Sequence, residues 1–278
     1  MTGAPDALNI ERIHDLADPR VSDFRVVRDR ELARRHGQFI AESPLVVETL
    51  IDRGTYDVTA VLLSESRLEY LQPVLQKLPD HVPVYVGAPE VVDALAGFKM
   101  HRSCLAAARR PVEASADAAL AALGPGRRTV VVLDRVSNHD NVGGIFRNAA
   151  CFGVDAVLLD NEAGDPLYRK AIRVSIAATL TVPYGRAADS SALLEALRRH
   201  GFESWALTPR ADVVDIEAAL ADSAPDRRLA LWLGKEGPGL STEAIEACER
   251  AVRIDMSAGP DALNVTSASA VALYVTAR

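Results

Sequence analysis

The stretch that decides the fold is Asp140-Asn141-Val142-Gly143-Gly144-Ile145-Phe146-Arg147-Asn148-Ala149-Ala150. It follows an apolar, valine-rich run at 129–133 that predicts a buried strand, and its own apolar spacing predicts a helix at 142–151. A polar loop with glycines at a strand-to-helix junction is where an α/β protein usually meets a ligand. Arg147 adds a permanent cation within that helix, so the junction indicates chemistry as well as packing.

From residue 128 onward the predicted strands and helices alternate. Strands are expected at 129–133, 155–159, 203–207, 229–233 and 251–255. Helices are expected at 142–151, 167–173, 190–200, 242–249 and 263–277. This alternation predicts an α/β fold whose mostly parallel sheet carries helices on both faces.

The preceding residues predict a second, smaller α/β domain. Ser43-Pro44 is a typical helix start, and Gly54 is a typical stop. The other elements expected here are strands at 58–63 and 82–86 and helices at 67–77 and 89–95.

A change of composition separates the two parts. Residues 113–128 are rich in alanine and contain Gly124-Pro125-Gly126, and turn residues of this kind often mark a boundary. We therefore expect a first domain at 1–112, a linker at 113–127 and a second domain at 128–278.

The chain of 278 residues has 49% hydrophobic and 25% charged residues and a net charge of -7. No apolar run approaches the roughly 20 residues of a membrane helix, and the N-terminus has no signal-peptide core. We therefore expect a cytoplasmic protein without a membrane segment. The acidic balance argues against indiscriminate nucleic-acid binding but leaves room for a local basic patch, for which the candidates are Lys99, His101, Arg102, Arg109 and Arg110.

The three cysteines, Cys104, Cys151 and Cys248, match no zinc-binding spacing. We expect free thiols and no metal site, which fits a reducing compartment.

The sequence also does not match two common phosphate-binding motifs. Gly234-Lys235 is followed by Glu236 where a P-loop needs Ser or Thr, and Gly143-Gly144 lacks the dinucleotide-binding spacing. NTPase and dehydrogenase functions therefore lose their main support.

Three separated motifs remain, each at the end of a predicted strand or the start of a predicted helix. The first consists of Asn141, Gly143 and Arg147. The second consists of Gly234, Glu236, Gly237 and Gly239. The third consists of Ile254, Met256, Leu263, Asn264 and Val265. In this order and spacing, residues 128–278 resemble the SPOUT superfamily of methyltransferases, in its SpoU/TrmH branch of RNA ribose 2′-O-methyltransferases.

The resemblance implies a C-terminal trefoil knot that holds S-adenosylmethionine, and a homodimer with the active site near the subunit interface. It implies cofactor contacts from Gly234, Ile254, Leu263, Met256 and Thr208. It implies catalytic roles for Arg147, Asn141, Asn264 and Glu236. The implied substrate is RNA, either tRNA or rRNA. Residues 1–112 resemble the family's substrate-binding domain, which is similar to an RNA-binding ribosomal protein fold, on the segment 37–43.

In the implied reaction a ribose hydroxyl attacks the methyl carbon of the cofactor, and its developing negative charge needs stabilisation. Because a guanidinium keeps its proton up to about pH 12, we expect Arg147 to act through charge and orientation rather than as a base. Asn141 and Asn264 would orient Arg147 or the ribose.

Several of these residues have structural alternatives. Asn141 and Asn264 could cap helices, and Glu236 could be an acidic residue in the first turn of a helix. Arg173 and Ser175 resemble the family's substrate-side helix region, or they belong to a salt-bridged helix.

The sequence departs from the family pattern at His139, Asp255, Ala262 and Thr266, and Ala262 and Thr266 each replace a serine. The missing hydroxyl at Ala262 leaves open a knotted protein that binds RNA or the ribosome with little or no methyltransferase activity. Methylation of a base rather than a ribose is a third possibility.

Overall fold

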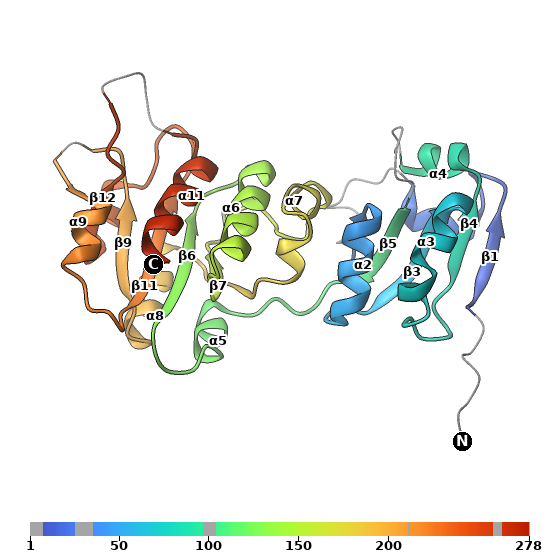
Figure 1. The fold of residues 1–278 in the computed structure, drawn as a ribbon, viewed down its shortest axis with the longest axis horizontal. Coiled ribbons are helices and arrows are strands. Elements are labelled where there is room, and N and C mark those ends of the chain that lie inside the picture. Colours follow the sequence, from blue (N-terminus) through green and yellow to red (C-terminus); the bar gives the residue numbers. More distant parts are fainter. Residues whose placement is uncertain (1–7, 26–35, 97–103, 211, 258–262, 278) are drawn as a thin grey trace. The chain divides into compact units, whose positions relative to one another are not determined.

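The computed structural model describes residues 8–25, 36–96, 104–210, 212–257 and 263–277 (Figure 1). The chain divides into two compact units. The first unit comprises Met1–Pro111 and Leu167–Leu180, and the second comprises Val112–Pro166 and Thr181–Arg278. Each unit has a sheet of its own.

The first unit is built on a five-stranded mixed sheet. Its strands lie in the order β1 (Ile10–Ile13), β4 (Val84–Gly87), β3 (Val58–Ser64), β5 (Cys104–Arg109) and β2 (Gln38–Glu42). Strands β1, β3 and β4 are parallel, whereas β5 is antiparallel to both β3 and β2. The helical elements are η1 (Pro19–Phe24), α2 (Pro44–Arg53), α3 (Glu65–Leu75), α4 (Pro89–Ala96), α7 (Arg169–Val174) and η2 (Ala178–Leu180).

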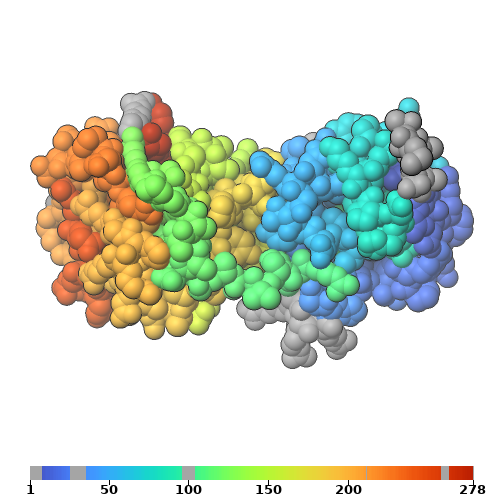
Figure 2. All heavy atoms as spheres, turned by 90° about the horizontal axis from the view of Figure 1, so that it is seen from below, coloured from blue at the N-terminus to red at the C-terminus, as the bar shows by residue number. Residues whose placement is uncertain are grey.

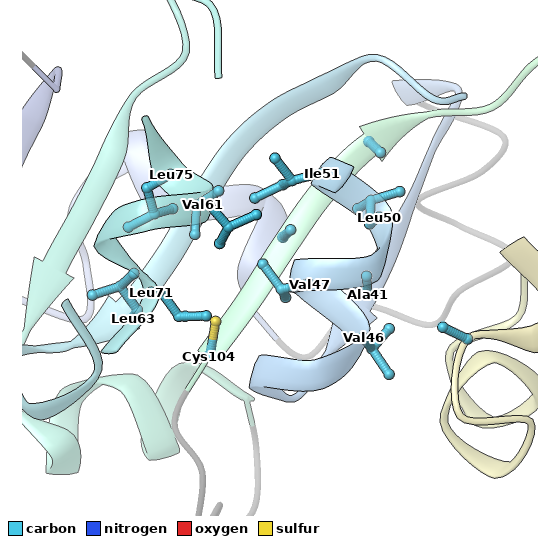
Figure 3. Packing of buried hydrophobic residues seen from close by; sticks show 14 of the residues in the cluster. Ala41, Val46, Val47, Leu50, Ile51, Val61, Leu63, Leu71, Leu75 and Cys104 are labelled. Carbon is cyan, nitrogen blue, oxygen red and sulfur yellow. The ribbon is translucent and has the colours of Figure 1, made fainter. Parts of the chain in front are cut away.

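Alternating side chains fill the core on the two faces of this sheet. Val61 and Leu63 of β3 pack with α2 and α3 on one face, and Leu62 packs on the other. Figure 3 shows Val47 and Leu50 of α2 in the first of these clusters. Helix α2 ends at Gly54, whose φ of 60° is the left-handed conformation expected at a helix stop.

The second unit is built on a seven-stranded sheet in which all of the paired strands are parallel. The strands lie in the order β10 (Val214–Asp215), β12 (Arg250–Arg253), β9 (Glu203–Leu207), β11 (Arg228–Gly234), β6 (Arg128–Asp134), β7 (Ala156–Leu159) and β8 (Tyr184–Arg186). The central strands β6 and β11 are buried along most of their length, as continuous apolar runs in parallel sheets usually are. The predicted α/β class with a mostly parallel sheet is therefore confirmed.

Helices cover both faces of this parallel sheet. The elements α5 (Ala116–Ala121), α8 (Ser190–Arg199) and α10 (Thr242–Ala247) pack near one another. Helix α11 (Val265–Thr276) contacts both α6 (His139–Cys151) and α9 (Ile216–Ala221), and Figure 1 shows α11 beside α6. The contact between α6 and α11 brings the first predicted motif to the last one.

The predicted strands and helices are present, with boundaries that differ by up to about three residues. Residues 113–127, expected as a linker, include α5, which packs against α8 in the second unit (Figure 2). A Cβ added to Gly185 of β8 would lie 2.6 Å from the carbonyl oxygen of Ser115, so this segment is tightly packed. The segment Leu167–Leu180, expected in the second domain, packs with the first unit.

None of the helices in the described residues combines the length and the apolar composition that a membrane span requires. The three cysteines are free. Burial raises the pKa of Cys104 and of Cys248 to about 12, whereas Cys151 is exposed on α6. Among the described residues, no cluster of His, Cys, Asp or Glu could hold a metal ion.

Candidate active site

A pocket of about 910 Å³ lies where three neighbouring parallel strands end. Its walls come from the loops that follow β9, β11 and β12 and from the start of α11. Carboxyl ends of parallel strands share one edge of a sheet, so residues far apart in sequence meet there. Seven of the nine predicted site residues line this pocket: Thr208, Gly234, Glu236, Ile254, Met256, Leu263 and Asn264.

The loop after β11 turns back on itself immediately at Gly234. A Cβ at this position would lie 2.3 Å from the nitrogen of Leu240 and 2.4 Å from the carbonyl carbon of Gly239. The N–H of Gly239 donates to the carbonyl oxygen of Lys235 at 2.9 Å, and Gly237 and Gly239 have positive φ angles. Glycine is therefore required at Gly234 by the close approach of backbone atoms, and it is favoured at Gly237 and Gly239 by their positive φ angles.

The pocket has apolar side chains that the protein itself leaves partly uncovered. Met256 is 40% exposed and Leu263 is 41% exposed, and both line the pocket. Thr208 is buried, and its backbone N–H donates to the carbonyl oxygen of Val252 at 3.0 Å, which fixes the end of β9 against β12. Apolar walls with a few fixed polar groups are typical of small-molecule sites.

Asn264 links the pocket to helix α6. Its Nδ2 donates to Oε1 of Glu236 at 2.5 Å and to Oδ1 of Asn141 at 3.3 Å. Its own Oδ1 accepts from the backbone N–H of Thr266 at 2.8 Å, which makes Asn264 the N-cap of α11. The predicted cap role of Asn264 is confirmed, and the same side chain also contacts the pocket network.

Asn141 lies inside α6 and is not its cap. The helix begins at His139, and the side chain of Asn138 caps it by accepting from the N–H of Asp140 at 2.9 Å. The predicted cap role of Asn141 is therefore wrong. Asn141 is only 5% exposed, and its Nδ2 has no hydrogen-bond partner among the described residues. A buried donor without a partner is rare in proteins and marks a group that a ligand can satisfy.

Arg147 does not line the pocket of its own chain. It lies six residues after Asn141, about 120° away around the axis of α6, and its side chain is exposed. Its side chain forms no hydrogen bond or ion pair with the part of the chain that the structure describes. The structure therefore brings together eight of the nine predicted site residues, with Asn141 joined through Asn264, and leaves Arg147 apart.

The structure also bears on the structural alternatives for Glu236, Arg173 and Ser175. Glu236 lies in a loop and α10 begins only at Thr242, so the first-turn role of Glu236 is wrong. Arg173 lies 3.6 Å from Glu42, and the Ser175 hydroxyl donates to the carbonyl oxygen of Ile172. These two contacts are those expected of the salt-bridged helix, and the substrate-side role stays a prediction. The basic candidates Lys99, His101 and Arg102, together with Ala262, lie outside the described residues.

Sequence reasoning missed the residues that join α6 to α11. Nδ2 of Asn148 donates to the carbonyl oxygen of Thr266 at 2.8 Å and to the hydroxyl of Ser269 at 2.9 Å. Asn141, Gly144 and Asn148 follow a spacing of three and four residues, so they share one face of a helix. That spacing is the signal that could have found them.

The chain matches the model of the SpoU rRNA Methylase family over residues 128–274. An uncharacterised tRNA/rRNA methyltransferase of Mycobacterium bovis is 39% identical over 278 residues, which cover 99% of this chain and 94% of that protein. A 23S rRNA (guanosine-2′-O-)-methyltransferase of a Burkholderia species is 30% identical over 187 residues, which cover 67% of this chain and 74% of that protein. The chain belongs to the SpoU rRNA methylase family, as its three motifs predict.

A solved structure shares the fold over both units. The AdoMet-bound rRNA methyltransferase of Sinorhizobium meliloti superimposes with a TM-score of 0.82, covering 96% of this chain and 97% of that chain. The sequence identity is 20%, so this likeness shows a common fold.

The turn at Gly234 gives a prediction about stability. Gly234→Ala should lower the free energy of unfolding by about 2–3 kcal/mol, because the added Cβ meets backbone atoms that no side-chain rotation can move. Gly237→Asn is the matched control in the same loop and should lose less stability, since a Cβ there meets nothing within 4 Å and asparagine adopts positive φ more readily than most side chains. Urea unfolding measures both. Equal losses in the two variants would contradict the close approach at Gly234.

Proposed function

We propose that this protein transfers the methyl group of S-adenosylmethionine to a ribose 2′-hydroxyl of tRNA or rRNA. Membership of the SpoU family makes the chain an RNA methyltransferase. The observation that carries the more specific proposal is the pocket at the carboxyl edge of the parallel sheet. It gathers seven predicted residues from three distant loops, with Asn141 hydrogen-bonded at its rim.

The residues of the pocket suit S-adenosylmethionine. Met256 and Leu263 offer uncovered apolar surface for a purine ring, and Gly234 and Ile254 line the pocket, where their backbone groups would hydrogen-bond the cofactor. Glu236 supplies a carboxylate that complements a positively charged sulfonium. The cofactor supplies an electrophilic methyl group and its own leaving group, so a metal ion is not required.

The protein's residues then act on the ribose. The buried Nδ2 of Asn141 is an unused donor that can hold a ribose oxygen, while Asn264 keeps the Asn141 side chain in place. Arg147 provides a fixed positive charge for the RNA phosphate and for the oxyanion that develops on the attacking hydroxyl. A guanidinium keeps its proton near neutral pH and therefore cannot serve as a base, so Arg147 contributes orientation and charge.

The position of Arg147 supports a homodimer in which it completes the site of a second chain. Arg147 is exposed and lies outside its own pocket. On the neighbouring helix α11, Val271 is 39% exposed and Tyr274 is 51% exposed, and Tyr274 meets Phe152 edge to face. An exposed apolar strip on α11, together with a cation on the neighbouring α6 that has no ion pair with a described residue, favours a symmetric contact between two copies.

Two structural features of the family belong to this proposal. A trefoil knot would account for a chain that places β12 between β9 and β10 and then packs α11 against α6. The segment 1–112 would bind the RNA, and 128–278 would carry out the chemistry in the cytoplasm, where tRNA and rRNA are found. The proposed RNA binding by residues 1–112 is supported by the resemblance of this segment to an RNA-binding ribosomal protein fold.

The chemical outcome tests the function. Purified protein with labelled S-adenosylmethionine and RNA from a host that lacks the gene should yield a ribose-methylated nucleoside on digestion and mass spectrometry. A label on a base would show the wrong acceptor. Binding of RNA and cofactor without transfer would favour the non-methylating protein that Ala262 leaves open.

Mixed dimers test Arg147 and the shared site together. Arg147→Ala and Asn264→Asp should each abolish turnover, and Arg147→Ala should still bind S-adenosylmethionine. In a dimer of one copy of each variant, one site combines an intact pocket with an intact Arg147, so activity should return to about half of the wild-type value.

Asn264→Asp keeps an N-cap acceptor on α11, so it removes the amide donor with little change in helix stability. Arg199→Ala, an exposed arginine of α8, is the control and should leave turnover unchanged. Mixed dimers that stay inactive would show that Arg147 works within its own chain. Full activity of Arg147→Ala would refute its role altogether.

A further inference from the structure

Thr266 contacts helix α6 at three successive points on one face. Its hydroxyl lies 3.4 Å from Oδ1 of Asn141, and its carbonyl oxygen accepts from Asn148 at 2.8 Å. Between these two, a Cβ placed on Gly144 would lie 2.5 Å from the Thr266 methyl group. The three positions on α6 share a face, so one residue of α11 spans two turns of the facing helix.

The same threonine also faces the pocket loops through its backbone. Its N–H donates to Oδ1 of Asn264 at 2.8 Å, and Asn264 in turn donates to Glu236 at 2.5 Å. Asn264 and Glu236 both line the pocket, whereas Thr266 does not. Thr266 therefore joins the pocket network to α6 without touching the space that a ligand would fill.

This contact leaves α6 little freedom to move. The hydroxyl of Ser269 accepts from Nδ2 of Asn148 and donates to the carbonyl oxygen of Thr266 at 2.7 Å. Because that carbonyl oxygen also accepts from Nδ2 of Asn148, the three groups form a closed ring of hydrogen bonds. At Gly144 helix α6 has no side chain, so its backbone lies directly against the side chain of Thr266. Rotation of α6 would break several of these contacts at once.

We propose that Thr266 is a positioning residue that fixes the rotation and distance of α6 relative to the methyl-donor pocket. Arg147 is the residue before Asn148, so the direction in which it leaves α6 is set by this contact. Asn141 is held in the same way by the Thr266 hydroxyl. The proposal rests on the function proposed above, because it explains how Asn141 stays aligned with the pocket of its own chain and how Arg147 leaves α6 in a fixed direction toward the second copy.

Two substitutions separate the roles of the threonine side chain. Thr266→Val keeps its shape and removes the hydroxyl donor, whereas Thr266→Ser keeps the donor and removes the methyl group. Thr266→Val should lower kcat by about 10–100-fold, because small misplacements of reacting groups cost that much. Its Kd for S-adenosylmethionine and its KM for RNA should stay within about threefold, and Thr266→Ser should retain most of the kcat.

Asn148→Ala tests the other end of the contact and should show the same fall in kcat with an unchanged cofactor Kd. Asn161→Ala is its control, since Asn161 is exposed and has no side-chain hydrogen bond with a described residue. Steady-state kinetics and calorimetric titration with S-adenosylmethionine measure these quantities. An unchanged kcat in Thr266→Val would overturn the proposal. A loss of affinity for S-adenosylmethionine as large as the loss of kcat would also overturn it. Equal falls in kcat in Thr266→Val and Thr266→Ser would do the same.

A thermal measurement keeps this inference separate from the proposed function. If the wild-type protein methylates no RNA, the proposed function is refuted. The contact between Thr266 and Asn141 is then tested by melting temperatures alone. Thr266→Val and Asn141→Ala should be coupled, so the double variant should lose clearly less than the sum of the two single shifts. Additive shifts would show that the hydroxyl does not hold Asn141, and would overturn the positioning role.

Discussion

The close approach of α6 and α11 at Gly144 is the contact on which the rest of the second unit depends. A side chain at this position would overlap the methyl group of Thr266, so only glycine lets the two helices meet here. The amide groups of Asn141 and Asn148 then bond across the contact on either side of it. Segments more than a hundred residues apart are joined in this way, and the first and third motifs become one site.

The parallel sheet supplies the other half of the site. Strands β9, β11 and β12 lie side by side and all run the same way, so their following loops meet at one edge. The turn at Gly234 brings Glu236 back over that edge, within reach of Asn264. The pocket is thus formed mainly by loops, while helix α6, which carries both Asn141 and Arg147, is held by packed contacts with α11.

Most of the fold follows from patterns in the sequence. The valine-rich run at 129–133 and the helices near 142–151 and 190–200 are long and periodic, so they are predicted well. Strands β8 and β10 span three and two residues, which is too short for any periodicity to show. The segment Leu167–Leu180 joins the first unit through apolar contacts of residues such as Ile172, and no local pattern says which core they enter.

The site is predicted in a different way. Its glycines and asparagines are found through the resemblance of three motifs to a family, and physical reasoning from composition alone would not have joined them. Asn141 shows the limit of local reasoning, since Asn138, three residues earlier, takes the capping role. Thr266 shows another limit: its importance arises from a helix-to-helix contact that no single stretch of sequence contains.

A crystal structure of the protein grown with S-adenosylmethionine is the most direct test of this account. The cofactor should occupy the pocket at the carboxyl ends of β9, β11 and β12, in contact with Gly234, Ile254 and Leu263 and with its methyl group directed toward Asn264. Cofactor bound anywhere else, or an empty pocket at a saturating concentration, would contradict it.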